Sequence, residues 1–113
     1  MTSLQDFVAQ IAKVQGVRGY LLLGRDGQIL SQNVRIAERL TALVVICGLN
    51  AESVMTAIGL SRFRCLVLAR GKKEKLLVFP AKQHFLLVIE KPDTYTPDLL
   101  KNIEAVIQSS MPS

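Results

Sequence analysis

The chain has 113 residues, of which 50% are hydrophobic and 20% are charged, and its formal net charge at pH 7 is +5. This length is close to the commonest domain size, and the apolar content is high enough to form a core, which excludes a disordered chain. We therefore expect one domain that spans residues 1–113.

The first segment, 3–14, has the pattern of an amphipathic helix. Ser3 can cap its amino end with Asp6 three residues later, and Gly16 ends it. Apolar residues recur on one side, which predicts a single face on the core: Leu4, Phe7, Val8, Ile11 and Val14. The segment is interrupted by polar residues and lacks a basic start, so we expect no secretory signal.

A β-hairpin is predicted over 17–33, with its turn at Arg25-Asp26-Gly27. An Asp-Gly pair between two apolar runs is a strong local signal for a hairpin. The run 20–23 is apolar at successive positions, and successive strand residues point to opposite faces. Both faces of this strand are therefore expected to be covered.

A long helix is expected over 36–60, and it is apolar on two opposite sides. The side expected to face the core carries Ile36, Leu40, Leu43, Val44, Cys47, Ala51, Val54 and Ile58. The other side carries Ala42, Val45, Ile46, Leu49, Ser53 and Thr56. A surface helix normally has one apolar side. We infer that the second side contacts another protein, most simply a second copy of the chain.

Three antiparallel strands with short connections are predicted over 62–70, 75–82 and 84–90. The first has basic residues at both ends of an apolar middle, which favours an edge position. A final helix is expected from Thr96, which can cap its amino end, with Pro97 at the first helical position.

Together these elements predict an α+β fold in the order helix, two strands, helix, three strands, helix. Strands that are buried on both faces need a covering layer on each side. We expect the two terminal helices to cover one face of a five-stranded antiparallel sheet and the long middle helix to cover the other. A twofold dimer would pair the middle helices antiparallel and join the edge strands that begin near Arg62.

The order of elements resembles that of the roadblock family, which includes roadblock-type dynein light chains and bacterial partners of small Ras-like GTPases. The resemblance covers about residues 4–108 and is carried by GVRGYLLLGRDGQILSQN, the apolar helix after it, and RFRCLVLARGKKEKLLVFPAKQHFLLVIE. It implies a profilin-like sandwich that forms a homodimer and acts as a platform for a small Ras-like GTPase.

The resemblance also implies which residues form the sites. The paired helices would contact each other through Ala42, Val45, Ile46, Leu49 and Ser53, and the pairing strand through Phe63, Cys65 and Val67. Glu38, Arg39 and Glu52 would lie at the rim of the groove and are candidates for partner contacts.

Other kinds of chemistry find little support in the sequence. The basic residues are spread along the chain and cluster only at the predicted turn 71–75, so we expect no nucleic-acid partner. His84 is the only histidine, the glycines at 16, 19, 24 and 27 form no nucleotide-binding loop, and the two cysteines lack metal-ligand spacing. We expect no catalytic site, cofactor or metal, and we place the protein in the reducing cytoplasm. The longest uncharged run near the middle, 40–51, is shorter than the roughly 20 residues of a transmembrane segment.

Two classes of function remain. The first is a homodimeric, non-catalytic adaptor or regulator of a Ras-like GTPase. The alternative is a small-ligand sensor with a pocket between sheet and helix, or a purely scaffolding dimerisation domain of profilin-like or longin-like type. Pockets for small ligands place a few polar groups in an apolar cavity, and the inner sides of the predicted elements contain almost none, which favours the first class.

Overall fold

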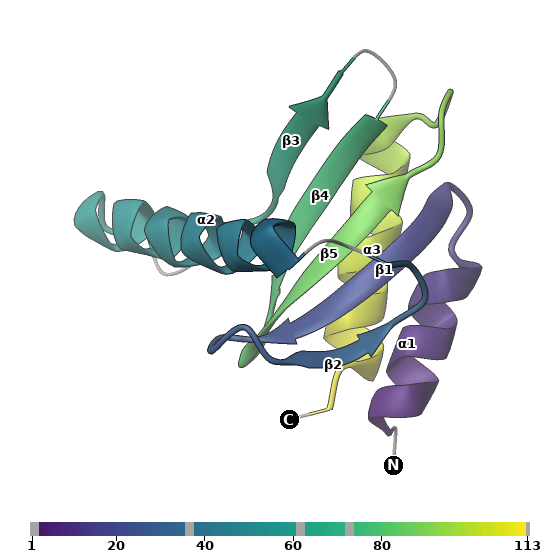
Figure 1. Ribbon diagram of the computed structural model, residues 1–113, viewed down its shortest axis with the longest axis horizontal. Coiled ribbons are helices and arrows are strands. Elements are labelled where there is room, and N and C mark those ends of the chain that lie inside the picture. Colours follow the sequence, from purple (N-terminus) through teal and green to yellow (C-terminus); the bar gives the residue numbers. More distant parts are fainter. Residues whose placement is uncertain (1–2, 36–37, 61–62, 72–73, 113) are drawn as a thin grey trace.

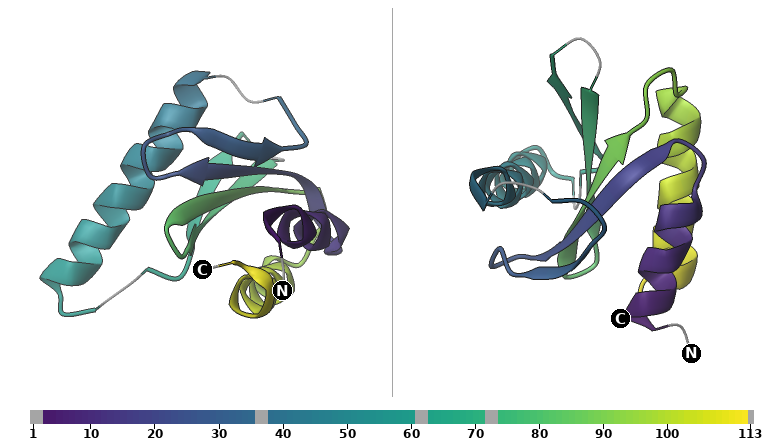
Figure 2. Two further views of the ribbon diagram at one scale, coloured as in Figure 1. Left: turned by 90° about the horizontal axis from the view of Figure 1, so that it is seen from below. Right: turned by 45° about the vertical axis from the view of Figure 1, so that its right-hand side comes forward.

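The computed structural model describes residues 3–35, 38–60, 63–71 and 74–112, without the side chains of Glu38 and Arg70. The predicted order of elements is confirmed: α1 (Leu4–Lys13), β1 (Val17–Gly24), β2 (Ile29–Gln32), α2 (Glu38–Ala57), β3 (Leu66–Arg70), β4 (Glu74–Ala81), β5 (His84–Glu90) and α3 (Thr96–Ser110). The strands form one antiparallel sheet in the order β2-β1-β5-β4-β3. Helices α1 and α3 cover one face, and α2 lies on the other (Figures 1 and 2).

Two local sequence features in the first third of the chain form the helix cap and the hairpin turn predicted for them. Ser3 Oγ accepts a hydrogen bond from the Asp6 backbone N–H at 3.1 Å, and the Asp6 carboxylate accepts one from the Ser3 N–H at 3.3 Å. This reciprocal pair satisfies two backbone donors that a helix start leaves free. In the hairpin turn, Gly27 has a φ of 90° and Asp26 Oδ1 accepts from the Gln28 N–H at 3.0 Å.

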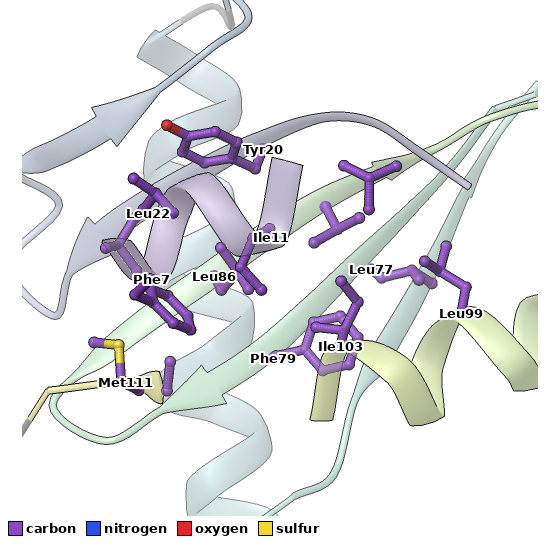
Figure 3. Close-up of a cluster of buried hydrophobic side chains, with 14 residues drawn as sticks. Phe7, Ile11, Tyr20, Leu22, Leu77, Phe79, Leu86, Leu99, Ile103 and Met111 are labelled. Atoms are coloured by element: carbon purple, nitrogen blue, oxygen red, sulfur yellow. The ribbon is translucent and has the colours of Figure 1, made fainter. Parts of the chain in front are cut away.

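The sheet has a hydrophobic cluster on each face, as expected for strands that are apolar at successive positions. The cluster under α1 and α3 is shown in Figure 3, where Phe7 and Ile11 of α1 meet Leu22, Phe79 and Leu86 of the sheet. The second cluster lies under α2 and is built around Leu21, Leu23, Val44, Val78 and Phe85.

The start of α3 differs from the prediction. Thr96 is the first helical residue and not the cap, and Tyr95 takes the cap position without a side-chain hydrogen bond to the helix. The Thr96 hydroxyl instead donates to Oε1 of the buried Glu90 at 2.6 Å, at the end of β5. The hydroxyl therefore satisfies a buried carboxylate, which is a stronger requirement than capping an exposed helix end.

The edge strand also begins later than predicted. Strand β3 starts at Leu66, so Phe63 and Cys65 precede it and do not belong to the pairing strand. Phe63 is buried, and its ring stacks on that of Phe85 with the centroids 6.4 Å apart. The predicted edge position of the strand is confirmed, because β3 pairs only with β4 in the described part of the sheet.

Candidate functional site

Helix α2 contacts the sheet through a face that differs from the predicted one. Val44 and Gly48 lie against the sheet as the centre of this face, and Thr41 and Val45 are also buried. Val45 had been expected on the outer side. Conversely, Leu43, Val54 and Ile58 had been expected on the core side, and they are 48%, 57% and 63% exposed.

The length of α2 explains most of this exposure. A helix of 20 residues is about 30 Å long, whereas the five strands of the sheet span only about 19 Å from edge to edge. The carboxyl-terminal end of α2 therefore extends beyond the sheet (Figures 1 and 2), although Ala51 and Met55 still pack against the cluster under the helix. Val54 lies in the last turn of α2, and Ile58 directly follows the helix.

Gly48 allows α2 to approach the sheet closely. A Cβ atom at this position would lie 2.6 Å from the nearest ring carbon of Phe85. The Phe85 ring is fully buried. The Arg25 guanidinium lies over this ring, with its Cζ atom 5.4 Å from the ring centroid. Arg25 pairs in turn with Glu52 of α2, with Nη1 2.7 Å from Oε1. The tip of the β1–β2 hairpin is thus tied to the carboxyl-terminal half of the helix, where Glu52 lies.

A groove runs between the β1–β2 hairpin and α2. It has a volume of about 560 Å³ and is lined by Asp26, Gly27, Ile29, Thr41, Ala42, Val45 and Ile46. We call it the hairpin groove. Ile29 and Ile46 are exposed at its rim, so an apolar surface is open to solvent on this side of α2.

The opposite side of α2 faces the open part of the sheet next to β3. Its exposed apolar residues are Leu43, Val54 and Ile58, and the half-buried Leu66 and Leu68 of β3 pack into the cluster under the helix. We call these five residues the β3-side face. Figures 1 and 2 show β3 and the hairpin on opposite sides of α2, so the helix presents two separate apolar surfaces.

The structure does not bring all of the predicted interface residues together. Ala42, Val45 and Ile46 line the hairpin groove, with Val45 buried in its floor, whereas Val67 is exposed on β3 at the other side of the helix. Leu49 and Ser53 are exposed on α2.

The residues predicted to contact a partner also lie in different environments. Arg39 is exposed in the first turn of α2, and Glu52 already pairs with Arg25 within the chain. The side chain of Glu38 lies outside the described residues.

A family model described as the Roadblock/LC7 domain matches residues 4–91. The chain belongs to the Roadblock/LC7 family. No curated protein sequence matches it.

Solved structures share the fold of this roadblock domain. Myxococcus xanthus MglB superposes with a TM-score of 0.75 at 16% identity, covering 96% of this chain and 89% of that one. A Roadblock/LC7 domain from Streptomyces avermitilis gives 0.73 at 18% identity, with 90% and 88% covered. Schizosaccharomyces pombe profilin gives 0.72 at 14% identity, with 94% of each chain covered, which confirms the predicted profilin-like architecture.

The Cys65 thiol in this roadblock domain is a weaker acid than an ordinary cysteine thiol. Burial raises the pKa of its thiol from the ordinary 9.0 to about 12, and the nearby Glu104 carboxylate acts in the same direction. The unfolded chain ionises this thiol above pH 9, whereas the native state keeps it protonated until about pH 12. The contribution of Cys65 to stability is therefore complete below pH 9 and is lost as the pH rises from 9 to 12.

We expect iodoacetamide at neutral pH to modify Cys65 much more slowly in the native protein than in urea, because only the thiolate reacts and burial suppresses it. Peptide mass spectrometry of quenched time points measures the two rates. Equal rates in native and unfolded protein would contradict this assignment.

Proposed function

We propose that this roadblock domain is a cytoplasmic, non-catalytic adaptor that forms a homodimer and binds a small Ras-like GTPase. The observation that supports dimerisation is the exposed apolar surface of α2. Leu43, Val54 and Ile58 are each about half or more exposed, and Leu60 after the helix is exposed as well. Contiguous apolar surface of this kind on a small domain is typical of an interface.

We expect the second copy to bind at the β3-side face. A twofold axis beside β3 would place two α2 helices antiparallel over the open part of the sheet and pair the two β3 edges. Each protruding α2 end would then cover apolar surface of the other copy, including the half-buried Leu66 and Leu68. Pairing would also satisfy the edge backbone groups of β3, which an exposed edge strand leaves available.

The apolar character of α2 has a second interpretation. Within the described residues, Arg39–Ala57 is long and apolar enough to cross a membrane by length and composition, with a mean hydropathy of 1.6. Core helices of globular proteins meet the same criterion. Val44 and Gly48 hold α2 against the sheet, and Glu52 forms an ion pair within the chain, so we favour protein contact over membrane insertion.

The GTPase partner is proposed from the family resemblance. Two antiparallel α2 helices would form a platform, and Arg39 in the first turn of each helix is an exposed charge at the ends of that platform. Glu52 is less available as a contact because it pairs with Arg25.

A pull-down against purified Ras-like GTPases of the same genome tests this function. Each GTPase is loaded with GDP or a non-hydrolysable GTP analogue and presented to the immobilised domain. Retention of the GTP form alone would support regulation, and retention of both forms would support scaffolding. Binding of neither form by any of these GTPases would contradict the proposal.

A further inference from the structure

We propose that the hairpin groove binds a small, largely apolar molecule that carries a primary amine. The groove lies on the other side of α2 from the β3-side face, so the proposed dimer leaves it open (Figure 2). Its volume of about 560 Å³ falls within the range of roughly 300–1,000 Å³ that is usual for small-ligand pockets. The site goes beyond the proposed adaptor function and does not depend on it.

Most of the groove wall is apolar. The hairpin contributes Ile29, and α2 contributes Ala42, Val45 and Ile46. Ile29 and Ile46 are 39% and 52% exposed, whereas Val45 is buried in the floor. An apolar ligand would displace water from these side chains, which is favourable in proportion to the apolar area that it covers. The body of the ligand should therefore be a hydrocarbon chain or ring.

One residue of the wall, Thr41, has a hydroxyl group that the described part of the chain leaves unsatisfied. Thr41 is 7% exposed, and its buried Oγ1 has no hydrogen-bond partner there. The hydroxyl of Thr56 in the same helix instead donates to the carbonyl oxygen of Glu52, one turn earlier. Buried hydroxyl groups in native proteins nearly always have a partner. A helical threonine has two accessible χ1 rotamers, so Oγ1 can turn toward a hydrogen-bond donor in the groove.

The second polar group of the groove, the Asp26 carboxylate, favours a positively charged ligand. Its Oδ1 accepts a hydrogen bond from the Gln28 N–H at 3.0 Å, which leaves Oδ2 for another donor. Among the described residues that line the groove, Asp26 alone is charged, and the neighbouring Arg25 already pairs with Glu52. A carboxylate only accepts hydrogen bonds, and the hydroxyl of Thr41 can accept them as well. A primary ammonium has the donors and the charge that both groups require.

An NMR titration of the wild-type protein with matched probes tests the site. The probes 2-phenylethylamine, 2-phenylethanol and phenylacetate share a ring and a short chain but end in an ammonium, a hydroxyl and a carboxylate. We expect the amine to bind with a dissociation constant on the order of 1 mM. The alcohol should bind several-fold more weakly, and phenylacetate at least about 10-fold more weakly, because Asp26 repels its charge. The shifted amides should belong to the hairpin turn and the first half of α2.

Thr41→Val tests the role of the hydroxyl group. The substitution puts a methyl group in its place, so the affinities for the amine and the alcohol should fall about fivefold. The midpoint in urea should rise, because a buried hydroxyl without a partner is removed. A loss of affinity in a more stable protein cannot result from unfolding. Thr56→Val, the same chemical change outside the groove, should leave binding unchanged.

Asp26→Asn tests the role of the charge. Asparagine keeps the side-chain oxygen that accepts from the Gln28 N–H, so the turn should stay closed. The amine should bind several-fold more weakly, about as the alcohol does, and the affinity for the alcohol should not change. Asp98→Asn, an equal change in charge on exposed α3, should alter neither affinity.

A lack of saturable shifts at the groove with 2-phenylethylamine would overturn the site and show that water alone occupies it. Equal affinities for the amine and phenylacetate would overturn the choice of an amine, as would an Asp26→Asn variant that binds the amine like the wild type. These outcomes leave the proposed adaptor dimer in place, because its residues lie on the other side of α2.

Discussion

Val54→Asp is expected to convert the protein from a dimer into a folded monomer in dilute solution. Val54 is 57% exposed in the isolated chain, so the substitution leaves its core intact. In the proposed dimer, each copy would place an unpaired carboxylate in the apolar seam, at a cost of about 3 kcal/mol. This cost corresponds to a weakening of the dimer by at least about 100-fold. Light scattering on dilute samples measures the change in mass.

Ala9→Asp is the matched control. Ala9 is exposed on α1, on the opposite face of the sheet, so the same new charge there should leave the dimer unchanged. Val45 is unsuitable for this test, because it is only 8% exposed and a charge there would disrupt the fold. Wild-type protein that is well folded yet has the 12.5 kDa mass of one chain would contradict the dimer.

Gly48→Ala is expected to destabilise the fold, although alanine normally favours a helix over glycine by about 1 kcal/mol. The new methyl group would lie 2.6 Å from the Phe85 ring. That ring cannot move aside easily, since it is fully buried and packed against Phe63 and Arg25. Overpacking of this kind costs about 1–3 kcal/mol, so after the gain in helix propensity we expect a net loss of up to about 2 kcal/mol and a lower midpoint in urea.

A double-mutant cycle with Phe85→Leu identifies the cause. The smaller side chain removes the ring atoms that the new Cβ would meet, so Gly48→Ala should cost much less in that background. Asn50→Ala, at an exposed position two residues along the same helix, controls for helix propensity and should cause no loss. An unchanged cost of Gly48→Ala in the Phe85→Leu background would exclude the steric explanation.

Features that depend on residues close together in the chain could be predicted from the sequence. The Ser3–Asp6 capping box and the Asp26-Gly27 turn are local structures whose hydrogen bonds involve residues two or three positions apart. The order of elements and the covering of both sheet faces also followed from sequence, because successive apolar strand residues leave no face for water. These features identified the roadblock architecture and an excess of apolar surface on α2.

The division of that surface depends on contacts between distant parts of the chain. A helix that is apolar almost all round has no preferred rotation about its axis, so its sequence cannot say whether Val45 or Val54 faces the sheet. Packing of Gly48 on Phe85, together with the Arg25–Glu52 pair, sets this rotation. These contacts join residues 27 or more positions apart in the chain, and local periodicity carries no information about them. Two separate apolar surfaces, and not one seam, are the result.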